Sequence, residues 1–226
     1  MSSANTCAPG VESPAYTGTP GDVLRFGSGF EVSVHARAKL PTSYGNFEIV
    51  AFRNNVDGKE HVAWVHGDVV GQADVPIRIH SECLTGDVFG SVKCDCRAQL
   101  ERAMEGIAAQ ERGVILYLRQ EGRGIGLANK IKAYSLQDIG FDTVEANLHI
   151  GFDDDLRSYE VAAAMVRLLG VESVDLLTNT PKKIDGLRDN GVHVSRRSPI
   201  QTAPTPENLL YLKTKVAKSG HILDFD

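Results

Sequence analysis

The sequence predicts an α+β fold, a mixed α/β arrangement in a single domain, with an N-terminal antiparallel β region and a central mixed sheet flanked by helices. Two observations predict it. Strand patterns, in which apolar and polar residues alternate, come first along the chain, and from about residue 97 helix patterns alternate with short strand patterns. The chain has 226 residues, of which 42% are hydrophobic and 23% charged, which is enough for a sizeable core.

Residues 1–28 differ from the rest of the chain because they are mostly Gly, Pro, Ser, Thr and Ala. A segment with so few large apolar side chains cannot offset the entropy lost on ordering, so we expect a flexible tail over residues 1–28 and a folded domain over residues 29–226. Cys7 is expected to be a free surface thiol, with a metal-ligand role as the less favoured alternative. The tail holds one basic residue, Arg25, and no apolar run, which argues against a secretory signal.

The first elements form a predicted hairpin that leads to a third strand. Residues 47–53 and 61–66 alternate between apolar and polar side chains, and Asn54–Gly58 separates them. The strand Val75–Ile79 then runs directly into His80. The later elements expected are a helix over 97–111, a strand over 114–118, a glycine-rich turn over 119–126, a helix over 127–138, a strand or loop over 143–150, a helix over 157–169 entered through 151–155, a strand over 174–179, a helix begun by Thr180-Pro181, a strand over 192–196 and a helix from Thr205-Pro206 to about residue 218.

Charge, hydropathy and cysteine usage exclude several classes of protein. Lys and Arg number 24 against 29 Asp and Glu, a formal net charge of -5, so we expect no nucleic acid partner. No apolar run approaches the roughly 20 residues of a membrane-spanning helix, so no membrane span is expected. The four cysteines are unevenly spaced, which favours metal-bound thiolates in a reducing cytoplasm over a disulfide framework.

Cys83, Cys94 and Cys96 carry the strongest chemical signal. Ten residues separate the first two, enough for a loop to return, and a single residue separates the last two, so three thiolates can converge on one ion. Soft thiolates select zinc, and three protein ligands leave a fourth position for a water that the ion activates. Two alternatives stay open: a structural zinc completed by His80 or Cys7, and ordinary buried cysteines.

The segment Arg119-Gln-Glu-Gly-Arg123 combines positive charge with glycine, which suits a phosphate chain. Glu121 has the acceptors to read the N–H edge of guanine. The glycine spacing matches neither a dinucleotide-binding fingerprint nor a P-loop, so a structural turn is an equal alternative. Two further runs are expected first of all to be solvated: Asp153-Asp-Asp155 with Arg157 at a predicted helix start, and Lys182-Lys183 at a predicted helix N-terminus, where backbone amides also favour anions.

Five motifs in this order closely resemble the GTP cyclohydrolase II family, from about residue 36 to the C-terminus. They are Arg78-Ile-His-Ser-Glu-Cys-Leu-Thr-Gly-Asp87, Cys94-Asp-Cys96, Arg119-Gln-Glu-Gly-Arg123, Asp142-Thr-Val-Glu-Ala-Asn147 and Leu177-Thr-Asn-Thr-Pro-Lys-Lys183. The resemblance implies a hydrolase acting on cyclic amidine C–N bonds, which converts GTP into formate, pyrophosphate and a diaminopyrimidine ribosyl phosphate at the start of riboflavin biosynthesis. It also implies zinc and magnesium, a homodimer, and a catalytic domain over residues 29–226 without a fused dihydroxybutanone phosphate synthase.

The resemblance assigns roles to individual residues. It places a catalytic acid at Asp155, a nucleophile at Arg157 and an aromatic residue beside the reacting base at Tyr134. Because a guanidinium stays protonated at neutral pH, a charge clamp is an equally good role for Arg157. The zinc ligands fall on Cys83, Cys94 and Cys96, and the GTP contacts on Arg78, Ile79, His80, Ser81, Glu82, Gln99, Glu121, Gly122, Arg123, Thr143, Thr178 and Lys183.

Three alternative functions remain open at this point. Some members of the family stop at a formamide product, although Tyr134 favours the complete reaction. His80-Ser-Glu82 beside cysteines is also typical of a zinc nucleobase deaminase, but the second half of that signature, with its paired cysteines after a proline, is missing. A zinc-stapled binding module is the third, for which the acidic net charge gives no support.

Overall fold

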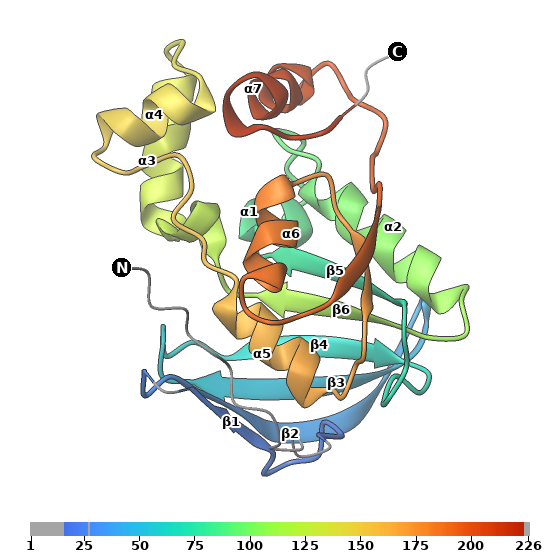
Figure 1. The fold of residues 1–226 in the computed structure, drawn as a ribbon. Coiled ribbons are helices and arrows are strands. Elements are labelled where there is room, and N and C mark those ends of the chain that lie inside the picture. Colours follow the sequence, from blue (N-terminus) through green and yellow to red (C-terminus); the bar gives the residue numbers. More distant parts are fainter. Residues whose placement is uncertain (1–15, 27, 224–226) are drawn as a thin grey trace, which may run out of the picture.

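The computed structural model describes residues 16–26 and 28–223, and these form one eight-stranded sheet with helices on both faces (Figure 1). The strand order across the sheet is β1-β2-β3-β4-β6-β5-β7-β8. The strands are β1 (Val23–Arg25), β2 (Glu31–Thr42), β3 (Gly45–Asn54), β4 (His61–His66), β5 (Val75–Ser81), β6 (Gly113–Leu118), β7 (Val174–Leu177) and β8 (Val194–Ser198).

All the helices follow β5 in the sequence, where they connect the parallel strands or follow the last of them. They are α1 (Leu84–Asp87), α2 (Cys96–Ala108), the 3₁₀ turn η1 (Glu121–Gly124), α3 (Leu127–Gln137), α4 (Thr143–His149), α5 (Glu160–Leu168), α6 (Pro181–Arg188) and α7 (Leu209–Ser219). Among the described residues, no helix has the length and apolar character needed to cross a membrane.

The sheet has an antiparallel half and a parallel half. Strands β1 to β4 pair antiparallel with one another, and β4 pairs antiparallel with β6. Beyond β6, strands β5, β7 and β8 continue the sheet in parallel. Ser81 lies opposite Leu118 in the ladder, so β5 and β6 end at the same level. In open sheets with parallel strands, ligands bind outside the carboxyl ends of the strands, which makes this edge the natural place for a site.

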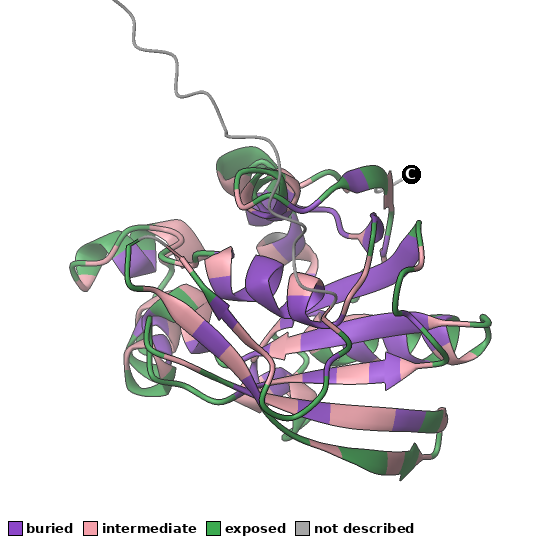
Figure 2. Cartoon of the chain, turned by 60° about the horizontal axis from the view of Figure 1, so that its bottom comes forward, coloured by how far each residue is buried: buried purple, intermediate pink, exposed green. Residues whose placement is uncertain are grey.

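Apolar residues of β6 face alternate sides and so enter two cores. Val114, Leu116 and Leu118 pack with the residues of α5 on one face, whereas Ile115 packs with those of α2 on the other. Helix α5 is buried on almost every side because Val161 to Val166 all lie inside. The central strands are accordingly buried along most of their length in Figure 2, while the turns that join the outer strands are exposed.

Most sequence-based expectations for the fold are confirmed. The α+β class is correct, the strands over 47–53 and 61–66 pair as the predicted antiparallel hairpin β3–β4, and β5 runs into His80. The helix expected from residue 97 is α2, the one expected over 127–138 is α3, and the one begun by Thr180-Pro181 is α6 with its proline at the first position.

The tail boundary at residue 28 is wrong. Val23–Arg25 form strand β1, which pairs with residues 31–33 of β2. Strand β2 itself was also not expected from the sequence. Pairing with a neighbouring strand supplies the hydrogen bonds and Leu24 supplies a buried side chain, so composition alone underestimates the order of this segment. Residues 1–15, and with them Cys7, lie outside the described residues.

Two expectations for the middle of the chain also need correction. Residues 143–149, expected as strand or loop, form helix α4, because Asp142 accepts hydrogen bonds from Val144 N and Glu145 N while the Glu145 side chain accepts one from Asp142 N. This capping box starts a helix whatever the strand propensity of the residues inside it. Helix α5 begins at Glu160 and not at Arg157, so residues 151–159 form a connection without helix.

Candidate functional site

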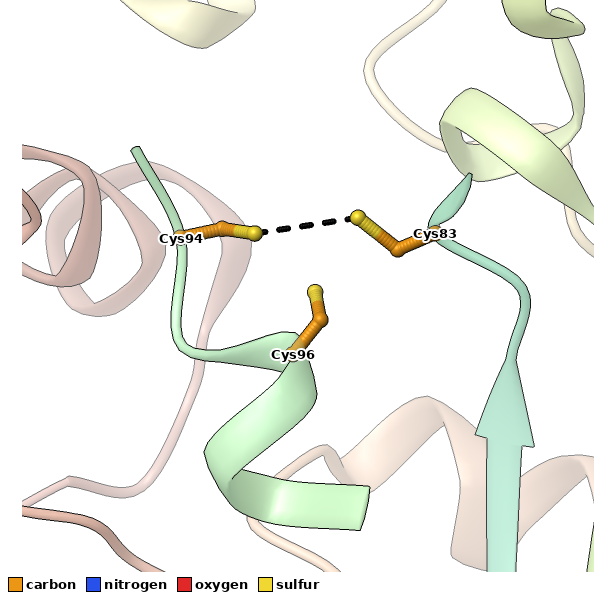
Figure 3. Close-up of side chains that lie close together, drawn as sticks. All are labelled: Cys83, Cys94 and Cys96. Carbon is orange, nitrogen blue, oxygen red and sulfur yellow. Dashed lines mark hydrogen bonds between the residues drawn. The ribbon is translucent and has the colours of Figure 1, made fainter. Parts of the chain in front are cut away.

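The thiols of Cys83, Cys94 and Cys96 converge beside the carboxyl end of β5. Cys83 follows that strand, Cys94 lies in the loop before α2, and Cys96 is the first residue of α2, so two backbone segments present the three thiols (Figure 3). The three Sγ atoms all lie within 4.8 Å of one another, and those of Cys83 and Cys94 are 3.7 Å apart. The predicted convergence of the three cysteines is therefore confirmed.

This arrangement fits a tetrahedral thiolate site. Zn–S bonds of about 2.3 Å at tetrahedral angles place sulfur atoms roughly 3.8 Å apart, close to the separation seen. Gly86 lies against the group, and a Cβ there would stand 2.9 Å from Cys94 Sγ and 3.2 Å from Cys83 Sγ. Among the described residues, the candidate metal-binding group contains these three cysteines without His80, whose Nε2 hydrogen bonds to Asp87 instead. The donor set is thus that of a three-coordinate protein site.

Asp87 holds the segment around Cys83, the candidate metal-binding loop, against the sheet. Its carboxylate accepts hydrogen bonds from Cys83 N at 3.0 Å and from the Tyr117 hydroxyl at 2.9 Å, and it lies 3.1 Å from His80 Nε2. The His80 ring stacks on the Tyr117 ring of β6. Burial lowers the pKa of His80, so its imidazole is neutral. These contacts fix the backbone at Cys83 before any ligand enters.

Lys130 links the cysteines to Glu121 and was not found from the sequence. Its Nζ lies 3.1 Å from Cys83 Sγ and 2.8 Å from Glu121 Oε1. The other Glu121 oxygen accepts a hydrogen bond from Leu84 N, so both oxygens are engaged within the protein. Glu121 also lines the cavity, so its contact with a guanine edge stays a prediction. The sequence could have indicated Lys130 as a site residue, because Tyr134 lies four residues later and therefore on the same face of α3.

Most residues singled out from the sequence meet in one cavity at the carboxyl ends of the parallel strands. Ile79 and Thr178 are fully buried and do not line it. Asp155 does not line it either, but it accepts a hydrogen bond from Arg157, which does. The site candidates that line the cavity are Arg78, His80, Ser81, Glu82, Cys83, Cys94, Cys96, Gln99, Glu121, Gly122, Arg123, Tyr134, Thr143, Arg157 and Lys183.

The cavity contains more positive than negative charge. Five of its cations have carboxylate partners, which are the pairs Lys93–Asp138, Arg123–Asp154, Lys130–Glu121, Arg157–Asp155 and Lys215–Asp95. Arg78 and Lys183 have no carboxylate within ion-pair distance among the described residues: Arg78 bonds to Leu177 O and Gln99, and Lys183 bonds to Ile79 O. Such a surplus of buried positive charge selects an anionic ligand.

The pKa values show the same surplus. Burial, opposed in part by Asp95, lowers the pKa of Arg78 to about 10. Burial and the neighbouring charges of Arg78, Arg157 and Lys215 lower the pKa of Lys183 well below its ordinary value. An opposite charge placed in the cavity would reverse both shifts, because it favours the charged forms.

Asp155 and Arg157 form a two-pronged ion pair that explains why α5 starts late. Arg157 Nε lies 2.8 Å from Oδ1 of Asp155, Nη2 lies 2.7 Å from Oδ2, and Arg157 N also donates to Oδ1. These bonds hold residues 155–157 out of a helix. Burial opposes the charge on both groups, but the pair outweighs it, so the pKa of Asp155 is lowered and that of Arg157 is raised. Arg157 thus stays a cation.

Comparison with known proteins agrees with this geometry. The family model for GTP cyclohydrolase II matches residues 33–199. The chain belongs to the GTP cyclohydrolase II family. The chain is 49% identical over 191 residues to the GTP cyclohydrolase-2 of Picrophilus torridus, which covers 84% of this chain and 99% of that protein. It is 52% identical over 189 residues to the GTP cyclohydrolase-2 of Klebsiella pneumoniae, covering 84% and 94%.

A longer relative shares the same region. The chain is 57% identical over 187 residues to the riboflavin biosynthesis protein RibBA of Bacillus subtilis, which covers 82% of this chain and 47% of that protein. The chain therefore spans about half the length of this relative, and the remainder of RibBA has no counterpart in the match. The family's hydrolase domain is the part that the two proteins share.

The uncompensated charge of Lys183 generates a prediction. Binding of inorganic pyrophosphate should take up protons over the pH range in which Lys183 titrates in the empty protein, because the anion raises the lowered pKa of Lys183. Calorimetry in two buffers with different ionisation enthalpies measures this uptake. Replacing Lys183 by Met should reduce it, whereas replacing the exposed neighbour Lys182 by Met should not; equal uptake in the two variants would contradict the prediction.

Proposed function

We propose that this protein hydrolyses GTP, opening the imidazole ring of guanine with release of formate and pyrophosphate to give a diaminopyrimidine ribosyl phosphate, as the first step of riboflavin biosynthesis. One observation carries the proposal: three converging thiols and the uncompensated cations Arg78 and Lys183 line the same cavity. A metal that activates water and a pocket that selects a polyanion are the two requirements of this reaction. Membership of the GTP cyclohydrolase II family supports the choice of GTP.

We infer that Cys83, Cys94 and Cys96 hold one Zn²⁺. When bound there, zinc supplies a water of lowered pKa and polarises an electrophilic carbon. We propose that Mg²⁺ enters with the phosphates of the substrate, since magnesium keeps several waters and takes phosphate oxygens as ligands. Lys130 lies against Cys83 and offsets part of the negative charge of the thiolates.

The phosphates are proposed to lie against the cations at the carboxyl end of β5. Arg78 and Lys183 lack carboxylate partners, and Arg123 keeps its Nη2 without a partner among the described residues. With the phosphates there, the base points toward the cysteines. The wider set of proposed GTP contacts adds Ile79, His80, Ser81, Glu82, Gln99, Glu121, Gly122, Thr143 and Thr178; of these, Glu121 supports the metal-binding loop and the fully buried Ile79 and Thr178 act through the backbone that they fix.

Arg157 is proposed to act as a charge clamp at the α-phosphate. Two of its guanidinium nitrogens are held by Asp155, and its Nη1 lies 3.4 Å from the Ser81 hydroxyl. A guanidinium fixed in this way is positioned to stabilise charge that develops when pyrophosphate leaves. Its raised pKa weighs against a nucleophilic role, because a nucleophile needs the neutral form. Asp155 then orients Arg157 and accepts the charge-assisted hydrogen bonds.

Tyr134 is proposed to move a proton beside the reacting base. Its hydroxyl lies 3.3 Å from the Thr85 hydroxyl, and its ring is contacted by the ammonium groups of Lys93 and Lys130. Burial raises the pKa of Tyr134, so the hydroxyl carries its proton at neutral pH and can donate it. This position favours the complete reaction over a stop at the formamide.

We further propose that the protein works in the cytoplasm and as a homodimer. The reduced thiols of a zinc site are maintained in a reducing compartment, which supports the first statement. The second rests on the family resemblance and is tested by sedimentation of the purified protein.

The proposed function is tested by incubating the zinc-loaded protein with GTP and measuring formate, ammonia and pyrophosphate together with the zinc content. We expect one zinc per chain, and formate and pyrophosphate in equal amounts. Ammonia without formate would instead indicate a nucleobase deaminase. Turnover that survives replacement of Cys83 by Ser would show a zinc with a purely structural role.

Replacing Tyr134 by Phe should make the N-formylated intermediate accumulate. The variant keeps the ring but lacks the hydroxyl proton, and loss of such a proton donor slows a step by about 10²- to 10⁴-fold. Mass spectrometry of the products measures the ratio of formamide to pyrimidine. Tyr44, which lies in the β2–β3 turn and packs against the core beneath α2, provides the matched control, and its change to Phe should leave that ratio as in the wild type.

Replacing Arg157 by Met should slow pyrophosphate release by about 10²- to 10³-fold, the usual cost of losing one donor to a developing charge. Replacement by Lys keeps the charge and should retain more of the rate, because a clamp needs a cation and not a particular nucleophilic atom. The exposed Arg53, changed to Lys, is the control. A phosphoryl adduct trapped on Arg157 of the wild-type protein by rapid quenching would establish the covalent role instead.

A further inference from the structure

Four buried nitrogen atoms around the cavity have no hydrogen-bond partner among the described residues, and one of them, His80 Nδ1, belongs to a ring that Asp87 already holds. The other three are Arg78 Nε on β5, Arg123 Nη2 in η1 and His221 Nδ1 beyond α7. These three residues line the same cavity, although 142 residues separate the first from the last in sequence. Buried polar groups in folded proteins nearly always have a partner, so these three atoms mark the place of an acceptor that comes from outside the chain.

His221 is the member of this group that neither the sequence motifs nor the proposed GTP contacts include. It follows Gly220, whose φ of 64° turns the chain back at the end of α7. The turn is fixed on both sides, because His221 N donates to Lys215 O at 3.1 Å and Ile222 N donates to Asn179 O at 2.8 Å. Asn179 lies just beyond the carboxyl end of β7, so the last described residues run along the edge of the sheet where the site is.

Helix α7 is itself tied to the cavity by buried polar contacts. Lys215 Nζ lies 2.9 Å from Asp95, the residue between two of the cysteines. The Ser219 hydroxyl donates to Asp154 at 2.8 Å, and Asp154 is the carboxylate that pairs with Arg123. The position of His221 is therefore set by the same residues that set the positions of Arg123 and Cys96, and Figure 1 shows α7 above the ends of the parallel strands.

The charge around His221 determines what its ring can bind. Burial first, and then the cations Lys215, Arg123, Arg157 and Lys183, lower the pKa of His221 to about 3. The imidazole is therefore neutral at physiological pH and carries one N–H. The carboxylates nearby already accept hydrogen bonds from Lys215, Arg123 and Arg157. In the tautomer that carries this N–H at Nδ1, a donor surrounded by cations is complementary to one class of acceptor, the oxygen atoms of a polyanion.

We propose that His221 is a substrate-contacting residue, whose Nδ1–H donates a hydrogen bond to a phosphate oxygen in the polyphosphate chain of the nucleotide. This inference rests on the proposed function, because it takes the anion in the cavity to be the phosphate chain of GTP. Together with Arg78 Nε and Arg123 Nη2, His221 makes a set of three unpartnered nitrogens that line one cavity from β5, η1 and the segment after α7. The C-terminal segment is thus part of the substrate site and not merely a cover for it.

Two substitutions separate the hydrogen bond from the packing of the ring. His221→Phe keeps a planar ring without a donor, whereas His221→Asn places an amide N–H near the position of Nδ1. Calorimetric titration with inorganic tripolyphosphate, without magnesium, measures the contact directly. We expect His221→Phe to weaken tripolyphosphate binding about tenfold, the usual effect of losing a hydrogen bond to a charged group, and His221→Asn to bind within about threefold of the wild type.

The exposed His35 on β2 provides the matched control, and His35→Asn should bind tripolyphosphate as the wild type does. The melting temperature of each variant shows that it is folded. The KM for GTP should rise in His221→Phe in parallel with the loss of tripolyphosphate affinity. Unchanged affinity in folded His221→Phe, or equal losses in the Phe and Asn variants, would overturn the assignment.

The two proposals fail in different ways. If the wild-type protein binds tripolyphosphate with the expected dependence on His221 but releases no formate from GTP, then the proposed function is wrong and the anion contact stands. If GTP turnover is normal and the affinity of His221→Phe for tripolyphosphate is that of the wild type, the proposed function stands and His221 makes no phosphate contact.

Discussion

The parallel pairing of β5 with β6 and β7 is the constraint on which the rest of the structure depends. Because the three strands run in the same direction, the segments that follow them leave the sheet at one edge. Cys83 follows β5, Glu121 follows β6, and Asn179 follows β7. Strand direction therefore brings chemistry from three distant parts of the chain to one edge, where long-range contacts such as Lys130–Cys83 and Lys215–Asp95 hold it. The antiparallel half of the sheet, β1 to β4, supplies core and no described cavity residue.

The charges at this edge oppose folding and favour binding. Burying Arg78 and Lys183 without carboxylate partners costs free energy in the empty protein, and the lowered pKa values of both groups are the measure of that cost. The core on the two faces of the sheet, with residues such as Leu116 and Ile107 fully buried, offsets it. An anionic ligand then gains affinity from charges that the protein has already desolvated. Because the apolar core offsets the cost of these charges, a protein with a net negative charge can hold a strongly positive cavity.

Features that depend on neighbouring residues could be predicted from the sequence, whereas features that depend on contacts between distant residues could not. The strand patterns over 47–53 and 61–66, the cysteine spacing and the Thr180-Pro181 helix start depend on neighbouring residues, and each corresponds to an observed feature. Strand β1 was missed because its order comes from pairing with β2. The late start of α5 depends on the ion pair of Arg157 with Asp155, and the occupied carboxylate of Glu121 depends on Leu84 and Lys130. No local pattern encodes such contacts, and Lys215 and His221 lie too far along the chain for spacing to indicate them.

The close approach of the cysteine sulfurs has a consequence for the redox chemistry of the protein. Hydrogen bonds shared with the Cys94 and Cys96 thiols, together with the ammonium of Lys130, lower the pKa of Cys83, so its sulfur is a thiolate at neutral pH. A thiolate 3.7 Å from a second sulfur is the arrangement that oxidises most readily to a disulfide. The geometry that suits a metal therefore makes the metal-free chain sensitive to oxidants. A bound ion would protect the thiols by occupying their lone pairs, so a metal-loaded chain should resist oxidants better than a metal-free one.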